Sequence, residues 1–501
     1  MADCTTFHYD IERLGRGTGA KPGAPWHKYA VISLGAAVRG APLYLHEWRF
    51  AKGPHKGKKR NIVIVATSAN YLCAFDIHAL RAGSTTALWA QFLGTPVTAT
   101  GSNIPPPLGV CSTPVIDRHK RRVYVIAFED NGAGIGVYHI YAVDLDTGAV
   151  IHSAPLHDTG ASGRPTFDGN AQDQRGALNH VGGAIVATFA DFFGYDSGTY
   201  HGWVVSCNAS NLKKQSYFSD TKNVLGGGCW GPGGAAAASD HTLYVGTGNA
   251  TTADAAYWAA IPAGSHPGDI GDYFEGVIKL KVKMQGTLPK LSLLDWYQPT
   301  NAKYQNDNDL DFGSSSPLVL PKISGKKLVV ISAKFGIYLL DRENLGHWGG
   351  ELWKAESVFP GESHSAPAYY RAPSGDHYLY FVGGGLPGLI CYKVVVGGGG
   401  ATLQESWRAT GGGIALGDVP GSPTIGATEV PPHALVWIVD ADSSSSATAL
   451  RAFDALNGTE VFNSTTVVSD ALGPVPHYPP ITCAEKSVFV GTGDGFACYG
   501  A

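Results

Sequence analysis

Three aspartates alternate in the segment Asp307-Asn308-Asp309-Leu310-Asp311. Alternating carboxylates can place several oxygens on one side of a turn, and oxygen is the ligand that hard cations such as Ca²⁺ prefer. The glutamate that would complete an EF-hand is missing, so an EF-hand is excluded. The segment therefore predicts either a cation-binding loop or a solvated turn of Asn and Asp residues.

Three further residues have types and positions that could do chemistry. Trp230 follows a run of glycines, Asn249 ends a Gly-Thr-Gly-Asn turn, and Lys334 precedes a Phe-Gly pair. A tryptophan can support a planar ligand or pack between blades. An asparagine can bind a cation or simply adopt left-handed turn geometry. A lysine can stabilise negative charge that develops during a reaction, or it can end a hairpin.

Composition limits the class of protein. The chain has 501 residues, 44% hydrophobic and 16% charged, with 66 glycines and a net charge of −4. This hydrophobic content is ample for a buried core, so a disordered chain is excluded. No basic stripe indicates nucleic-acid binding, and no apolar run is long enough for a membrane helix. The first residues, Met1–Cys4, lack the features of a signal peptide.

Short apolar runs bounded by turn residues recur along the whole chain and predict an all-β fold. Each repeat opens on a Ser-Pro-type segment, and its third strand ends in aspartate, at Asp76, Asp144, Asp341 and Asp454. An outer strand then carries an aromatic residue, namely Trp89, Trp296, Trp353, Trp407 or Phe462. Four strands per repeat of this length predict the blades of a β-propeller.

Seven repeats span about residues 40 to 468, and an eighth begins near Tyr478 and lacks its outer strand. The segment Trp26–Leu34, within a closing region of about 26–39, could supply that strand to the last blade, about 476–501. Such closure would pair the edges that an open sheet leaves exposed. We therefore expect one domain, residues 1–501, forming an eight-bladed β-propeller of four-stranded antiparallel blades. The alternative is seven blades with an extra hairpin.

Several repeats are similar to the tryptophan-docking motif of dehydrogenases that use pyrroloquinoline quinone (PQQ). Ala142, Asp144, Gly148 and His152 keep its spacing, as do Ala452, Asp454, Gly458 and Phe462. Four central motifs resemble, in order and approximate spacing, the PQQ-dependent alcohol dehydrogenases and PQQ-like repeat proteins. They are Gly226-Gly227-Gly228-Cys229-Trp230-Gly231, Leu243–Asn249, Asp307–Gly313 and Ser332–Arg342. The blade pattern covers nearly the whole chain, and the site motifs cover about residues 190 to 345.

The resemblance implies a role for each matching residue. Trp230 would be the surface on which PQQ stacks, and Lys334 would lie beside the quinone oxygens. Asp311 would be the base that removes the alcohol proton. Asn249 would bind Ca²⁺, with Asp309 and, in the preceding blade, Asp196 as candidate carboxylate ligands.

The chain departs from this family at three points. An adjacent cysteine pair, which many alcohol-oxidising members carry, is absent, and Cys111 stands alone. The haem-attachment sequence Cys-x-x-Cys-His is also absent, so any electron acceptor would be a separate molecule. Asn249 begins a glycosylation sequon, and a glycan there would block a cation site.

Two functions follow from these observations. The first is a PQQ- and Ca²⁺-dependent oxidoreductase that acts on the hydroxyl group of an alcohol, sugar or polyol. The second is a non-catalytic PQQ-like propeller that binds a glycan or protein partner, or assembles with itself, because fold alone does not fix function. The family resemblance implies an extracytoplasmic or secreted location.

Overall fold

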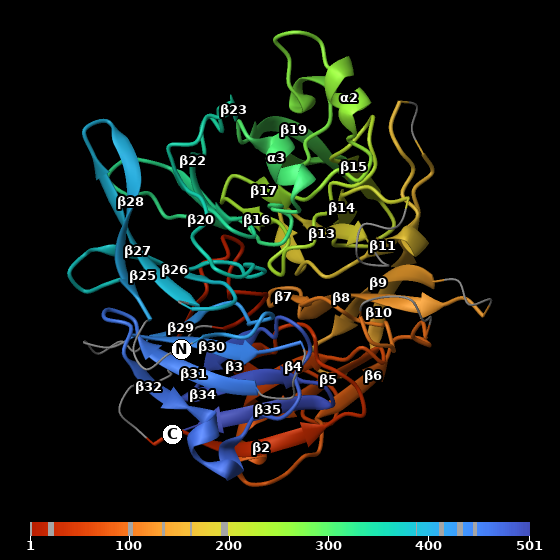
Figure 1. Cartoon of the computed structure of the whole chain (residues 1–501). Coiled ribbons are helices and arrows are strands. Elements are labelled where there is room, and N and C mark those ends of the chain that lie inside the picture. The colour runs from red at the N-terminus through yellow and green to blue at the C-terminus, as the bar shows by residue number, and fades with distance from the viewer. Residues whose placement is uncertain are drawn as a thin grey trace.

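Eight four-stranded antiparallel sheets form the blades of a closed propeller in the computed structural model (Figure 1). The structure describes residues 3–18, 25–98, 104–132, 136–160, 163–191, 199–386, 388–409, 415–427, 434–443 and 448–500. The predicted eight-bladed, all-β fold is thereby confirmed, and the seven-bladed alternative is wrong.

The blades are numbered in chain order from the first complete repeat. Blade 1 comprises β3 (Leu43–Arg49), β4 (Lys59–Ala66), β5 (Tyr71–Asp76) and β6 (Trp89–Phe92), and blade 2 comprises β7 (Val115–Asp117), β8 (Arg122–Asp130), β9 (Gly136–Asp144) and β10 (Val150–Pro155). Blade 3 comprises β11 (Gln172–Asp173), β12 (Asn179–Val181), β13 (Ala184–Asp191), β14 (Trp203–Asn208) and β15 (Gln215–Ser219). Blade 4 comprises β16 (Ala236–Ala237), β17 (Thr242–Thr247), β18 (Gly276–Gln285) and β19 (Leu288–Gln298), and it is extended by β23 (His347–Trp348). Blade 5 comprises β20 (Leu318–Val319), β21 (Leu328–Ser332), β22 (Ile337–Asp341) and β24 (Trp353–Ala355), and blade 6 comprises β25 (Ala368–Arg371), β26 (His377–Val382), β27 (Leu389–Gly397) and β28 (Gly400–Arg408). Blade 7 comprises β29 (Thr424–Ala427), β30 (Ala434–Ala441), β31 (Thr448–Asp454) and β32 (Glu460–Asn463), and it is extended by β1 (Arg16–Thr18). Blade 8 comprises β33 (Ile481–Ala484), β34 (Ser487–Thr492), β35 (Gly495–Gly500) and β2 (His27–Ser33). The helices of the described residues are short: α1 (Ile77–Arg81), α2 (Ala255–Ala260) and α3 (Ala302–Asp307), with the 3₁₀ turns Gly169–Ala171, Pro267–Ile270, Ser464–Thr466 and Val468–Asp470.

The two ends of the chain close the ring within blade 8. Strand β2 pairs antiparallel with β35, with Val31 opposite Ala497. In Figure 1 the red β2 lies beside the blue β35. The closing strand expected from the N-terminal segment is thereby confirmed. This pairing gives the C-terminal strand the partner that it would otherwise lack.

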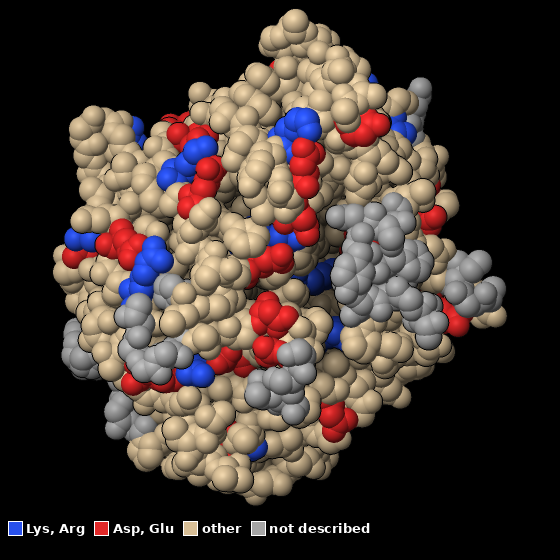
Figure 2. Space-filling view, in the orientation of Figure 1, with Lys and Arg blue, Asp and Glu red and all other residues tan. Residues whose placement is uncertain are grey.

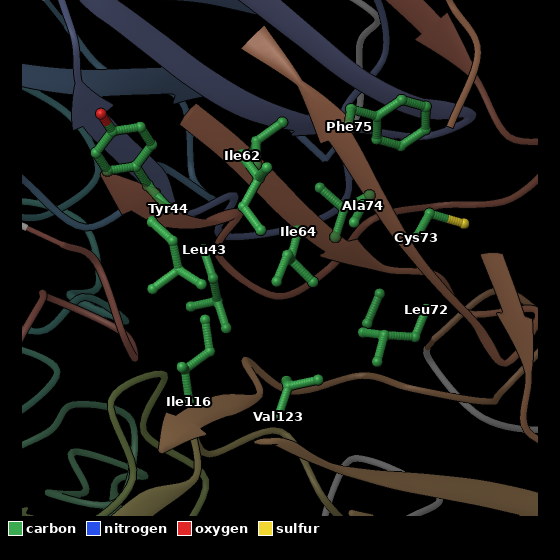
Figure 3. Packing of buried hydrophobic residues seen from close by; sticks show 14 of the residues in the cluster. Leu43, Tyr44, Ile62, Ile64, Leu72, Cys73, Ala74, Phe75, Ile116 and Val123 are labelled. Atoms are coloured by element: carbon green, nitrogen blue, oxygen red, sulfur yellow. The ribbon is translucent and has the colours of Figure 1, made fainter. Parts of the chain in front are cut away.

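The core lies between neighbouring blades. The first and second strands are buried on both faces, as in Ile62–Ala66 of β4, because each blade is covered by a neighbour on either side. For this reason these strands are continuous apolar runs, without the alternation of a half-exposed strand. Figure 3 shows this packing, with Leu43 and Ile64 of blade 1 facing Ile116 and Val123 of blade 2.

Aromatic residues on outer strands pack against the glycine turn of the next blade. A Cβ atom added to Gly148 would lie 2.8 Å from the Trp89 ring, and one added to Gly458 would lie 2.5 Å from the Trp407 ring. Both glycines have a φ of 74°, which L-residues adopt at a cost. These two positions therefore require glycine both for the turn and for the close approach of the indole.

Residues 3–18 contact the innermost part of every blade, a feature that the sequence patterns did not predict. Backbone hydrogen bonds join this segment to Tyr44, Ile116, Ala237, Val319, Tyr369 and Ile425, and side-chain bonds join it to Asn179 and to the backbone of Cys483. The guanidinium of Arg13, 0% exposed, donates to the carbonyl oxygens of Phe7 and Leu178. The segment thus ties the blades together near the axis.

Candidate active-site cavity

A cavity of about 920 Å³ lies at one end of the propeller and is lined by residues from all eight blades. In Figure 2 the molecule is hollowed near the middle of the visible face, and acidic and basic side chains gather around the hollow. The wall is built from segments that precede the first strand of a blade, such as that of Trp230, and from connections between the second and third strands, such as that of Asn249. Because strands alternate in direction, both kinds of segment lie at the same end of a blade.

The residues singled out in the central motifs meet in this cavity. Trp230, Asn249, Asp309, Asp311 and Lys334 all line it. Asn249 is 8% exposed, Asp311 3% and Lys334 5%, whereas the side chain of Asp309 is 60% exposed. Asp196, the remaining candidate, lies outside the described residues.

Lys334 lies between two of the aspartates. Its Nζ is 2.5 Å from Oδ1 of Asp309 and 3.3 Å from Oδ2 of Asp311. Burial alone would lower the pKa of Lys334, but the two carboxylates outweigh it and hold that pKa above its usual value. The ammonium group is therefore charged at neutral pH. The backbone N–H of Ser314 donates to Oδ1 of Asp311 at 2.7 Å, which fixes this carboxylate from its other side.

Asn249 presents an oxygen that no donor of the described residues reaches. Its Nδ2 donates to the carbonyl of Asn306 at 3.5 Å, while its Oδ1 is buried and accepts no hydrogen bond from the part of the chain that the structure describes. Asp311 is close to the same turn, since a Cβ added to Gly248 would lie 3.6 Å from Asp311 Oδ1. A buried polar atom without a partner is costly unless a ligand satisfies it. Amide and carboxylate oxygens fit a hard cation such as Ca²⁺.

Carboxylates outnumber basic groups around the cavity. The acidic residues are Asp173, Asp191, Asp309, Asp311, Glu362, Asp418 and Asp442, and the basic ones are Arg39, Arg175 and Lys334. This imbalance favours a bound cation. No group of three His, Cys, Asp or Glu within the described ranges is arranged as a complete metal site, so Asn249 and other oxygens would have to contribute.

The ring of Trp230 is surrounded by polar side chains. The guanidinium carbon of Arg175 lies 5.2 Å from its ring centre, Lys334 Nζ lies 5.9 Å away, and the His364 ring is 5.3 Å away. The two cations are within reach of cation–π attraction. These neighbours hold the indole ring in place, and Trp230 still lines the cavity.

Arg175 is a site residue that the sequence patterns missed. It also lies over Tyr478, 4.5 Å from the ring centre, and donates to the backbone carbonyl of Trp230 at 3.2 Å. Burial lowers the pKa of Arg175 to about 10, which still leaves it charged at neutral pH. It stands alone between two short strands, so no local motif marks it.

His364, which belongs to none of the motifs above, lies in the cavity wall. Its Nε2 is 2.9 Å from Oε2 of Glu362, and its ring also contacts Tyr478 at 4.7 Å. Burial lowers the pKa of His364, and the Glu362 carboxylate opposes this only in part. Cys111 also lines the cavity, and no disulfide joins it to another cysteine.

Two solved dehydrogenase structures are similar to this chain. In structure the chain is similar to the quinohemoprotein alcohol dehydrogenase from Comamonas testosteroni, with a TM-score of 0.61 and 14% identity over 99% of this chain and 80% of that one. It is also similar to a europium-containing methanol dehydrogenase, with a TM-score of 0.64 and 12% identity over 99% of this chain and 90% of that one. No family model and no curated protein matches the sequence. At these identities the similarity establishes a shared fold. None of the described helices has the length and hydropathy that crossing a membrane requires.

Proposed function

We propose that this protein is a quinoprotein-type oxidoreductase that uses PQQ and Ca²⁺ to oxidise the hydroxyl group of an alcohol, sugar or polyol. The observation that carries the proposal is that Trp230, Asn249, Asp311 and Lys334 line one cavity. They come from separate motifs spread over about a hundred residues of sequence. Independent packing roles would give no reason for the four to meet.

The residues that would hold the two groups are distinct. Trp230 offers an aromatic face to the planar quinone, and Lys334 offers a charged donor to its oxygens. Oδ1 of Asn249 and the carboxylate of Asp309 would bind the cation, with Asp196 as a further candidate. When bound, PQQ supplies a two-electron acceptor that takes hydride from the substrate carbon.

Asp311 would accept the proton of the substrate hydroxyl. One of its oxygens receives the Ser314 N–H and the other faces Lys334, so the carboxylate is held in one orientation. General-base catalysis requires such a group within hydrogen-bond reach of the hydroxyl. Lys334, which stays charged, would stabilise negative charge on the oxygens nearby. Electrons would leave to a separate acceptor in an extracytoplasmic setting.

The test is a titration of the purified protein with PQQ and Ca²⁺, followed by absorbance and then by dye reduction on a panel of alcohols and sugars. Saturable binding that is lost in Trp230→Ala and in Asn249→Ala is the expected result. Trp353→Ala is the matched control, because Trp353 lies on the outer strand β24 and packs on Tyr392, and neither residue lines the cavity.

A non-catalytic propeller is the second candidate. It is favoured by the lone Cys111, which no disulfide joins to another cysteine. Such a protein would use the cavity or a blade face to bind a glycan or a protein partner, or would assemble with itself. Absence of PQQ binding at high micromolar cofactor would support this candidate, and glycan binding and self-association would then be measured.

A further inference from the structure

The side chain of Asn306 forms two hydrogen bonds with the backbone of Ala250, the residue after Asn249. Asn306 is the fifth residue of α3, and its Oδ1 accepts from the Ala250 N–H at 2.7 Å. Its Nδ2 donates to the Ala250 carbonyl at 3.2 Å. A primary amide that bonds both atoms of one residue fixes the position and the orientation of that backbone. The residue immediately before Ala250 is Asn249, so its Cα position is fixed as well.

A second contact, made by the backbone of Asn306, determines which atom Asn249 presents to the cavity. The backbone carbonyl of Asn306 accepts the Asn249 Nδ2 at 3.5 Å. The amide nitrogen is therefore directed toward α3, and Oδ1 is the atom that remains for a ligand. Asn306 itself does not line the cavity, so it acts through Asn249.

Asn306 also connects two loops that carry the oxygen donors. It precedes Asp309 and Asp311 by a few residues on the connection into blade 5, while Asn249 belongs to blade 4. The two loops approach closely, since a Cβ added to Gly313 would lie 2.7 Å from the Gly248 nitrogen. Groups that orient a ligand residue commonly matter almost as much as the ligand itself.

We propose that Asn306 is a positioning residue that holds Asn249 Oδ1 beside Asp311 and directed toward a hard cation. This inference rests on the cation site of the proposed function. Replacing Asn306 with alanine removes both of its side-chain hydrogen bonds to Ala250. Asn249 can then shift relative to Asp311, although the hydrogen bond from the Gly227 N–H to its carbonyl remains. The cation then loses a protein oxygen and takes water in its place.

The experiment uses Tb³⁺, a hard cation that prefers oxygen ligands as Ca²⁺ does, with emission sensitised by tryptophan and competition by Ca²⁺. We expect Asn306→Ala to weaken Tb³⁺ and Ca²⁺ binding by about 10- to 100-fold. The Tb³⁺ lifetime in H₂O and D₂O should report about one more bound water. Asn308→Ala is the matched control, since Asn308 is exposed and its side chain donates to the Tyr304 carbonyl of α3.

The outcomes separate this inference from the proposed function. Weaker binding in Asn249→Ala with unchanged binding and lifetime in Asn306→Ala would overturn the positioning role and leave the cation site in place. Absence of saturable Tb³⁺ binding by the unmodified protein would overturn both. A merely structural role would lower the melting temperature of Asn306→Ala without changing the lifetime. Should Asn306→Ala fail to fold, Asn306→Gln keeps the amide at a displaced position and is expected to weaken binding in the same direction.

Discussion

Lys334 and Asp311 are joined twice, once through the backbone and once through their side chains. The Lys334 N–H donates to the Asp311 carbonyl at 3.1 Å, and the Lys334 ammonium lies 3.3 Å from the Asp311 carboxylate. The backbone bond places the second-strand end of blade 5 beside the loop that enters the blade. The ion pair is therefore built into the path of the chain, and it needs no bound molecule to form.

Removing the positive charge of Lys334 from this ion pair should destabilise the protein. Lys334→Met removes the positive charge beside the buried Asp311 carboxylate, and we expect the free energy of unfolding to fall by about 1–3 kcal/mol at pH 7. This range lies below the full cost of breaking a buried ion pair, because Asp309, the other carboxylate partner of Lys334, is exposed to solvent. Urea unfolding measures the difference. Lys303→Met removes an exposed pair with Asp307 and should change stability by less than about 1 kcal/mol.

The same pair predicts how stability depends on pH. The folded-state pKa of Lys334 is raised, so the stabilisation is complete below the usual lysine pKa of about 10.4 and is lost as the pH rises above it. The stability gap between the unmodified protein and Lys334→Met should thus be constant between about pH 7 and 10 and shrink at higher pH. A gap that is the same at every pH would contradict the assignment.

Asp311→Asn tests the proposed base. The substitution keeps the shape of the side chain and removes its ability to accept a proton, so dye reduction with saturating PQQ should fall by about 10²- to 10⁴-fold. PQQ binding, followed by absorbance, should persist. Asp307→Asn is the control from the same aspartate series, because Asp307 is exposed and pairs with Lys303. Full activity in Asp311→Asn would exclude it as the base.

The fold could be predicted because its signals are local. The third strands β9 and β31 end at Asp144 and Asp454, as the repeat pattern indicated. The buried second strands are readable as apolar runs because both faces of each blade are covered. Residues 3–18 could not be predicted in the same way. Their partners lie in eight different blades, so no local period marks them.

The residues of the candidate site likewise fall into two groups, those that a local motif indicates and those that it does not. Trp230 and Asn249 stand in short motifs at strand ends, and the sequence pointed to both. Arg175, His364 and Tyr478 come from blades 3, 6 and 8, and they meet only because the ring closes. A contact that depends on ring closure leaves no trace in the spacing of residues along the chain.

Arg175 should matter for an anionic planar ligand and not for the cation. Arg175→Met removes a guanidinium that lies over Trp230, so PQQ affinity is expected to fall by about 10-fold or more. Ca²⁺ affinity, measured by Tb³⁺ competition, should stay the same or rise, because one positive charge leaves the cavity wall. Arg371→Met, at the exposed end of β25, is the control. Equal PQQ affinity in Arg175→Met and the unmodified protein would place the ligand elsewhere in the cavity.

Asp10, in the segment that joins the blades near the axis, should make the fold less stable at alkaline pH. Burial raises the pKa of Asp10 to about 7, and the Leu14 N–H that donates to its Oδ1 at 3.0 Å opposes this only in part. A folded-state pKa above the unfolded value of about 3.9 means that stability is fully present below that value and is lost as the pH rises through about 7. Asp10→Asn keeps the acceptor for Leu14 and cannot ionise. We expect it to exceed the unmodified protein in stability by about 1–3 kcal/mol at pH 8 and to equal it near pH 4. Urea unfolding at several pH values measures this, with the exposed Asp494→Asn as the control. A stability difference that does not change with pH would mean that Asp10 is not the group that titrates.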